Sequence, residues 1–195
     1  MTTKLTGSKK VATIAITAAL YAVFFFISGL IAMPQFTLLY LPILLLGVFP
    51  LWFGINGLVG SMIGAFIGGA FVEGLGFFSW IESATTLIIY VLVWLLIPKN
   101  AWEVKNPKTL LHLISVYAIT LLAGTSYILW QFTTFGLLPP DVAQLILWPT
   151  FTLNIIIEIA ICPVLLRTLT PKMRNWSFYS GNFMEWRSQK TKTKL

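Results

Sequence analysis

Two polar side chains lie one helical turn apart inside the last long apolar stretch of the sequence. Asn154 precedes Glu158 by four residues, so both side chains share one face of a helix. A carboxylate in the membrane interior is costly and usually faces a cavity or a partner group. We therefore expect these residues to line a cavity that binds a ligand. The alternative is a structural hydrogen bond between neighbouring helices.

Further candidate ligand-binding residues gather in the last three apolar stretches. The full set of predicted substrate-binding residues is Trp80, Glu82, Tyr127, Trp130, Gln131, Trp148, Asn154 and Glu158. Aromatic rings can sandwich a planar ligand, while the carboxylates suit an amine or a cation. The simpler alternative for the aromatic residues is the belt of Trp and Tyr found at membrane surfaces. For Glu82 it is a solvated carboxylate at a helix end.

Residues suited to catalysis, metal binding or ATP hydrolysis are sparse. The sequence contains one histidine, His112, and one cysteine, Cys162, which is too few for a typical metal site. It has neither a Gly-x-x-x-x-Gly-Lys-Ser/Thr phosphate loop nor a Gly-x-Ser-x-Gly nucleophile motif. We therefore predict no enzymatic activity, no metal and no cofactor for this chain.

The composition indicates a membrane environment. Of the 195 residues, 57% are hydrophobic and only 10% are charged, whereas a soluble domain has about a quarter charged residues. A net charge of +7 would indicate nucleic-acid binding in a soluble protein. Here the positions of the charges explain it better, and we expect the lipid bilayer, not nucleic acid, as the surrounding partner.

Six apolar segments are long enough to cross a hydrocarbon core about 30 Å thick. They are residues 11–32, 36–53, 55–72, 80–97, 109–133 and 144–167. The predicted fold is an all-α bundle of six transmembrane helices. It divides the chain into a basic N-terminus (1–10), one transmembrane domain (11–170) and a basic, aromatic tail (171–195) that rests on the membrane, is disordered or docks a partner.

The distribution of charge predicts the orientation. With six spans, all thirteen Lys and Arg residues fall on one side of the membrane, and the other side carries Glu73, Glu82 and Asp141. By the positive-inside rule, both termini are then cytoplasmic. We expect a multi-pass protein of the plasma membrane.

Two stripes of small residues allow close helix packing. The third span has a groove formed by Gly57, Gly60, Gly64 and Gly68. The first span has a strip formed by Ala12, Ala15, Ala18, Ala19 and Ala22. Small-xxx-small spacing lets helix backbones approach closely. We predict that the groove packs within the bundle, with a dimer interface as the alternative. The strip faces either a helix of this chain or a partner protein.

These residues give the chain a resemblance to a known family. It resembles the substrate-binding S components of energy-coupling-factor (ECF) vitamin transporters over most of its length. The stretch "KKVATIAITAALYAV" is similar to the family's first span, whose Ala-x-x-x-Ala motif is matched by Ala15 and Ala19 and by Ala18 and Ala22. The run "LLLGVFPLWFGINGLVGSMIGAFIGG" is similar to the family's second span, its glycine-containing turn and its glycine-rich third span.

The resemblance implies a substrate-capture subunit of an ATP-driven importer of a vitamin or a precursor. The alanine motif would then dock on a separate transmembrane T component driven by two ABC-type ATPases. Substrate would bind from outside, in a pocket of spans four to six, and the subunit would topple to release it inside. The alternative is a structural membrane protein that oligomerises. A stand-alone secondary carrier would usually show repeated halves and broken helices, which the sequence does not display.

Overall fold

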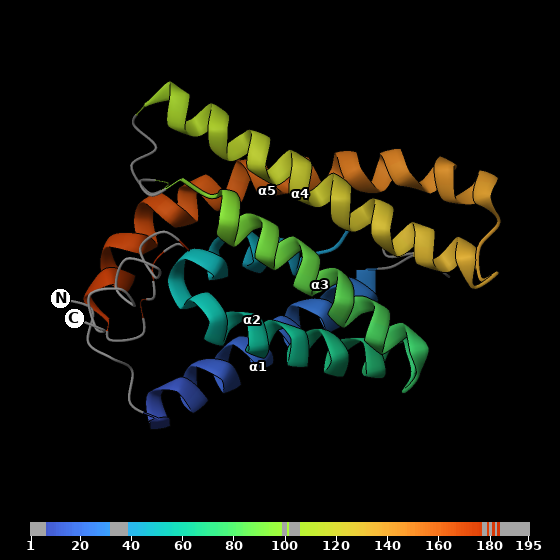
Figure 1. Ribbon diagram of the computed structural model, residues 1–195, viewed down its shortest axis with the longest axis horizontal. Coiled ribbons are helices and arrows are strands. Elements are labelled where there is room, and N and C mark those ends of the chain that lie inside the picture. The colour runs from blue at the N-terminus through green and yellow to red at the C-terminus, as the bar shows by residue number, and fades with distance from the viewer. Residues whose placement is uncertain are drawn as a thin grey trace, which may run out of the picture.

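The regular secondary structure of the described residues is entirely α-helical. A computed structural model describes residues 7–31, 39–98, 101, 106–176, 179, 181 and 183. The helices are α1 (Gly7–Ile31), α2 (Ile43–Glu73), α3 (Phe77–Leu96), α4 (Pro107–Thr134) and α5 (Pro140–Asn175) (Figure 1). All five are long and apolar enough to cross a membrane. The fold is therefore an all-helical bundle with five candidate membrane spans in the described residues.

The predicted second and third spans belong to one broken helix, α2. Its backbone leaves the helical conformation at Gly54, with φ 52° and ψ −135°, a region that glycine tolerates. Figure 1 shows α2 turning sharply back on itself. The Tyr90 hydroxyl donates a shared hydrogen bond to the carbonyl oxygens of Gly54 (2.6 Å) and Phe49 (3.0 Å). Tyr90 thus satisfies backbone acceptors at the break. Residues 36–38 of the predicted second span lie outside the described residues.

Helix α5 is longer than the sequence predicts. It runs to Asn175 with Pro149, Pro163 and Pro171 inside it, although the tail was expected to begin at Pro171. A proline in a helix removes one backbone hydrogen bond, and these three are accommodated without ending the helix.

The tail also contacts the bundle. The Trp94 indole N–H donates to the Gly181 carbonyl (3.4 Å), and its ring meets Phe183 edge-on with 5.4 Å between centroids. The Arg174 guanidinium lies 5.7 Å from the ring centre of Tyr179. The described tail residues therefore pack against α3 and α5, an arrangement that the sequence analysis did not anticipate.

The glycine groove of α2 receives α1. A side chain at Gly64 would overlap the Ala18 carbonyl and Tyr21, and one at Gly68 would overlap Phe25. Gly60, Gly64 and Gly68 of the groove are therefore covered by the face of α1 that carries these residues, and Gly57 faces Tyr90 of α3. This confirms the prediction that the groove packs within the bundle.

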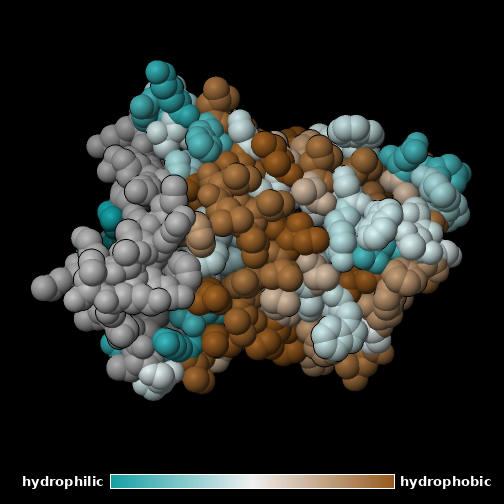
Figure 2. Space-filling view, in the orientation of Figure 1, coloured by the Kyte–Doolittle hydropathy of each residue, from teal (hydrophilic) through white to brown (hydrophobic). Residues whose placement is uncertain are grey.

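Apart from the buried Glu82 and Glu158, the charged residues that the structure describes lie at the two ends of the bundle. The starts of α1 and α4 lie at the same end as the C-terminal parts of α3 and α5 (Figure 1). The described cations at this end are Lys9, Lys10, Lys108, Arg167, Lys172 and Arg174. We call it the basic end. Asp141 begins α5 at the opposite end. Figure 2 shows a brown apolar band between the two ends, as expected for a membrane-embedded surface.

Candidate functional site

Polar groups from three parts of the chain meet at Tyr40. This residue belongs to the short segment 39–42 that precedes α2. Its backbone N–H donates to the Asn154 side-chain oxygen on α5 (2.8 Å). Its hydroxyl donates to the Glu82 carboxylate on α3 (3.3 Å). Glu82 and Asn154 are 6% and 1% exposed. Two predicted site residues that are far apart in sequence are therefore buried on either side of one tyrosine.

A chain of hydroxyl groups extends from Tyr40 into the bundle. The Tyr21 hydroxyl lies 2.8 Å from the Tyr40 hydroxyl and 2.8 Å from the Thr86 hydroxyl. Each hydroxyl has one hydrogen. Because Tyr40 donates to Glu82, Tyr21 must donate to Tyr40, and Thr86 must donate to Tyr21. All the donors are thus oriented towards the Glu82 carboxylate, which accepts hydrogen bonds when ionised.

The last bond of this chain is the weakest. Hydroxyl-to-oxygen hydrogen bonds usually measure about 2.5–3.0 Å, and the bond from Tyr40 to Glu82 is 3.3 Å. Tyr21, Tyr40 and Thr86 are not among the site residues predicted from the sequence. The two tyrosines could have been recognised because a tyrosine inside an apolar stretch must find a partner for its hydroxyl.

Glu158 lies one helical turn after Asn154 on the same face of α5, closer to the basic end. The Asn154 side-chain N–H donates to the Thr150 carbonyl (2.8 Å) one turn earlier. Glu158 is 0% exposed, and neither of its carboxylate oxygens has a hydrogen-bond partner among the described residues. An unpaired charge in an apolar interior is strongly unfavourable. This carboxyl group therefore requires a proton or a positively charged partner.

The surroundings of Glu158 combine the first half of α2 with Tyr117 of α4 and Cys162 of α5. A Cβ at Gly47 would lie 3.2 Å from a Glu158 carboxylate oxygen and 2.7 Å from the Cys162 sulfur. The Tyr117 hydroxyl donates to the Gly47 carbonyl (3.1 Å), and the Cys162 thiol donates to the Leu44 carbonyl (3.5 Å). The absence of a side chain at Gly47 gives the carboxylate its space.

Three of the predicted aromatic residues lie on the surface. Trp80, Trp130 and Trp148 expose 66%, 58% and 60% of their surface. Trp80 packs edge-on against Phe66 (5.0 Å) and Trp148 against Phe151 (6.2 Å). Such exposure is typical of indoles at a membrane interface. The structure therefore places these rings at the surface and Glu82 and Asn154 in the interior.

Tyr127, Trp130 and Gln131 form a small cluster on α4. The Gln131 amide donates to the Tyr127 hydroxyl (2.9 Å), and the rings of Tyr127 and Trp130 are 6.0 Å apart. These contacts lie within one helix.

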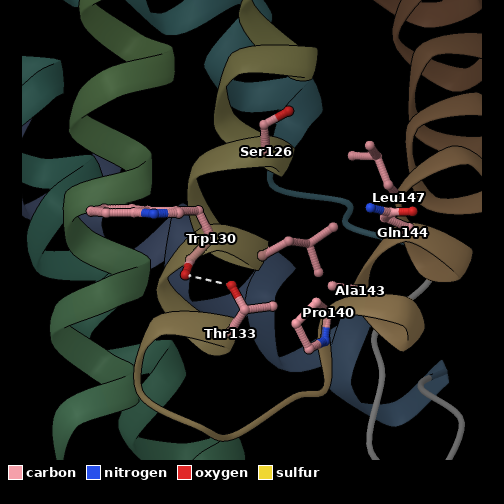
Figure 3. Close-up of a pocket in the computed structure, with 8 residues that line it drawn as sticks. Ser126, Trp130, Thr133, Pro140, Ala143, Gln144 and Leu147 are labelled. Carbon is pink, nitrogen blue, oxygen red and sulfur yellow. Dashed lines mark hydrogen bonds between the residues drawn. The ribbon is translucent and has the colours of Figure 1, made fainter.

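A groove of about 230 Å³ opens nearby between α4 and α5. It is lined by Ser126, Leu129, Trp130, Thr133, Pro140, Ala143, Gln144 and Leu147. In Figure 3 the indole of Trp130 points away from Gln144 and Leu147. Sites for drug-sized ligands usually measure about 300–1,000 Å³. This groove alone is therefore small for a vitamin.

The alanine strip of α1 lies mostly on the outside. Ala15 and Ala19 are exposed and Ala12 and Ala22 are partly buried. Ala18 is buried at 8% exposure against Gly64. The inner face of α1 thus fills the groove of α2 and leaves a second, smooth face on the surface of the chain.

Comparisons with known proteins add no identification. No protein-family model, curated protein or solved structure matches the sequence. Within the described residues, no three His, Cys, Asp or Glu side chains gather into a metal site. The function must therefore be argued from the residues of this chain.

Proposed function

We propose that this chain is the substrate-capture subunit of an ATP-driven importer, of the kind represented by ECF S components. It binds a vitamin or a vitamin precursor from outside and passes it inward together with a T component and two ABC-type ATPases. The observation that carries the proposal is Glu158, whose carboxylate is fully buried without a hydrogen-bond partner among the described residues. A carboxylate in the membrane interior is a functional residue by default.

The polar residues of α5 give the ligand a direction of approach. Asn154 lies one helical turn closer to the opposite end than Glu158. A ligand from that end meets the Asn154 amide first and the Glu158 carboxylate second. The amide orients the ligand, and the carboxylate pairs with an amine or a cationic ring nitrogen. A charge-assisted hydrogen bond of this kind supplies the compensation that the buried carboxylate lacks.

The proposal includes six spans and two cytoplasmic termini. The break at Gly54 divides α2 into two antiparallel spans, and the described cations then share the cytoplasmic side. Residues 43–53 rise only about 16 Å as a helix, about half of the hydrocarbon core. Secondary carriers break their helices near the membrane centre, whereas this break lies near the basic end (Figure 1).

The exposed alanine strip is the proposed docking face for the T component. The glycine groove of α2 already holds the inner face of α1, which includes Ala18, and the exposed Ala15 and Ala19 lie outside this contact. These two residues lie at the centre of the strip and allow a partner helix to approach closely. Small residues at this position match the resemblance that the sequence displays.

Native mass spectrometry of the full chain, purified gently from its own host membranes, tests the proposal. We expect a bound small molecule, or an assembly with one T component and two ATPases. The alternative function, a structural protein whose polar residues tie helices together, also has support, because Tyr40 contacts both α3 and α5. A chain found only as a ligand-free monomer or homo-oligomer would overturn the importer and favour that alternative.

A further inference from the structure

Tyr40 occupies acceptors on two of the predicted substrate-binding residues. One is the Asn154 amide oxygen, which accepts from the Tyr40 backbone N–H, and the other is the Glu82 carboxylate, which accepts from the Tyr40 hydroxyl. We propose that Tyr40 is an internal substitute for the ligand, so that the segment 39–42 is displaced when ligand donors take over these two acceptors. This inference rests on the proposed function and deepens it by naming the competitor.

The geometry of Tyr40 defines the class of ligand. A tyrosine presents an aromatic ring with an N–H donor at one end and an O–H donor at the other. Both donors are used here, and the ring lies edge-on to Phe25 at 5.6 Å. A molecule that replaces Tyr40 therefore has a flat ring with a hydrogen-bond donor at each end. A cationic amine facing Glu82 forms a shorter and stronger bond than a neutral hydroxyl does.

The contacts of the segment show where displacement begins. The bond from the Tyr40 hydroxyl to Glu82 is long, at 3.3 Å, whereas the Leu41 backbone N–H donates to the Ser28 hydroxyl at 2.8 Å. The segment is thus held firmly on α1 and on α5, where Asn154 accepts at 2.8 Å, and weakly at the carboxylate of α3. A ligand that reaches Glu82 first meets the weakest contact. Once Tyr40 leaves, the Tyr21 hydroxyl can donate to the ligand instead.

The first measurement compares the ratio of ligand-bound to ligand-free protein in native mass spectra of the full chain. Tyr40→Phe removes the competing hydroxyl, so we expect this ratio to rise about fivefold. A tyrosine that contacts the ligand, or that only ties helices together, gives an equal or lower ratio, and either result would overturn the inference. Glu82→Gln should lower the ratio, because it removes the negative charge that attracts the ligand.

Tyr90→Phe is the matched control. It also removes one buried tyrosine hydroxyl, which here bonds to Phe49 and Gly54. We expect lower stability without a rise in the bound ratio. A rise in the bound ratio of this variant as large as in Tyr40→Phe would contradict the inference, because a general weakening of helix packing would then explain both results.

A second measurement follows the segment directly. Leu39→Cys, combined with Cys162→Ala to remove the native thiol, reports access to the segment through labelling by a membrane-impermeant maleimide. We expect labelling several times faster after Tyr40→Phe is added. An unchanged rate would show that the segment is a fixed part of the fold and would refute its displacement.

The two proposals fail in different ways. A bound molecule whose ratio does not rise in Tyr40→Phe overturns only the substitution of Tyr40 for the ligand. The absence of any bound molecule or ATPase partner in every variant, wild type included, overturns the importer and this inference with it.

Discussion

The two halves of α2 both use glycine to bring another helix close, but they meet different surfaces. Gly64, in the second half, faces the Ala18 backbone and Tyr21 on α1. Nearby on α1, the Thr17 hydroxyl donates to the Thr13 carbonyl of its own helix (2.9 Å). Gly47, in the first half, faces the Glu158 carboxylate and Cys162 on α5, and this carboxylate has no hydrogen-bond partner among the described residues.

The two halves of α2 thus form two kinds of interface, one that only packs helices and one that buries an ionisable group. At Gly64 close approach gains dispersion contacts and leaves no buried charge. At Gly47 close approach buries a carboxylate beside the Cys162 sulfur with no hydrogen-bond partner among the described residues, which costs stability. A protein that needed only a stable bundle would gain by replacing Glu158 with an apolar residue. The first interface is therefore structural, and at the second the proposed ligand would offset the cost of burying the carboxylate.

Gly64→Leu should have the largest effect, because it destroys the first interface. The new side chain would overlap the Ala18 carbonyl and Tyr21, and we expect a loss of about 3 kcal/mol in the free energy of unfolding. Denaturation in SDS-containing mixed micelles measures it. Gly7→Leu is the control, since a Cβ at Gly7 meets nothing within 4 Å. Equal stability of the two variants would contradict the packing of α1 on α2.

Ala19→Trp tests the outer face of the same helix. Ala19 is exposed, so we expect normal folding and a loss of T-component association of about 100-fold, or about 2.7 kcal/mol. Co-purification with the ATPase module measures the association. Leu20→Trp, at a site that is 41% exposed but outside the strip, should associate normally. Unimpaired assembly of Ala19→Trp would assign the strip to lipid, and unfolding of that variant would assign it to internal packing.

Glu158→Gln tests the second interface. We expect ligand binding to weaken about tenfold, or 1.4 kcal/mol, because a charge-assisted hydrogen bond is lost. Stability should stay equal or rise, because the variant removes a buried, unpaired carboxyl group. Native mass spectrometry and unfolding in mixed micelles measure the two effects. Asp141→Asn is the control on the same helix, at an exposed position in its first turn. A large loss of stability in Glu158→Gln would make the residue a structural tie instead.

Local sequence patterns predicted several features of the two interfaces. The spacing of Gly60, Gly64 and Gly68 predicted close packing, and the four-residue spacing of Asn154 and Glu158 placed both on one helix face. The span boundary expected near Gly54 coincides with the break in α2. These features depend on residues a few positions apart, which helix geometry relates directly.

Contacts between residues far apart in the sequence could not be predicted from local patterns. The bond between Tyr40 and Asn154 joins residues 114 positions apart, and the apolar context of Tyr40 gave no partner for it. Whether the alanine strip of α1 faces a helix of this chain or a partner protein was also open. The structure places the face of α1 with the larger side chains, Thr17, Tyr21 and Phe25, in the groove of α2. The sequence predicts a last span that ends at residue 167 and a tail that begins at Pro171, whereas α5 continues through Pro171 to Asn175.

Thr170→Val gives the smallest expected effect and the sharpest contrast with Glu158. Both residues lie on the buried face of α5 and both are 0% exposed. The Thr170 hydroxyl accepts a hydrogen bond from the Trp52 indole N–H of α2 (2.9 Å). Valine leaves that donor without a partner, so we expect a loss of about 1 kcal/mol in unfolding free energy and unchanged ligand binding.

Thr168→Val is the matched control, because the exposed Thr168 bonds only to carbonyls of its own helix among the described contacts. If Thr170→Val weakened ligand binding as much as Glu158→Gln does, the whole interface between α2 and α5 would act as one unit. The separation of a structural and a ligand-binding polar group on this face would then be wrong.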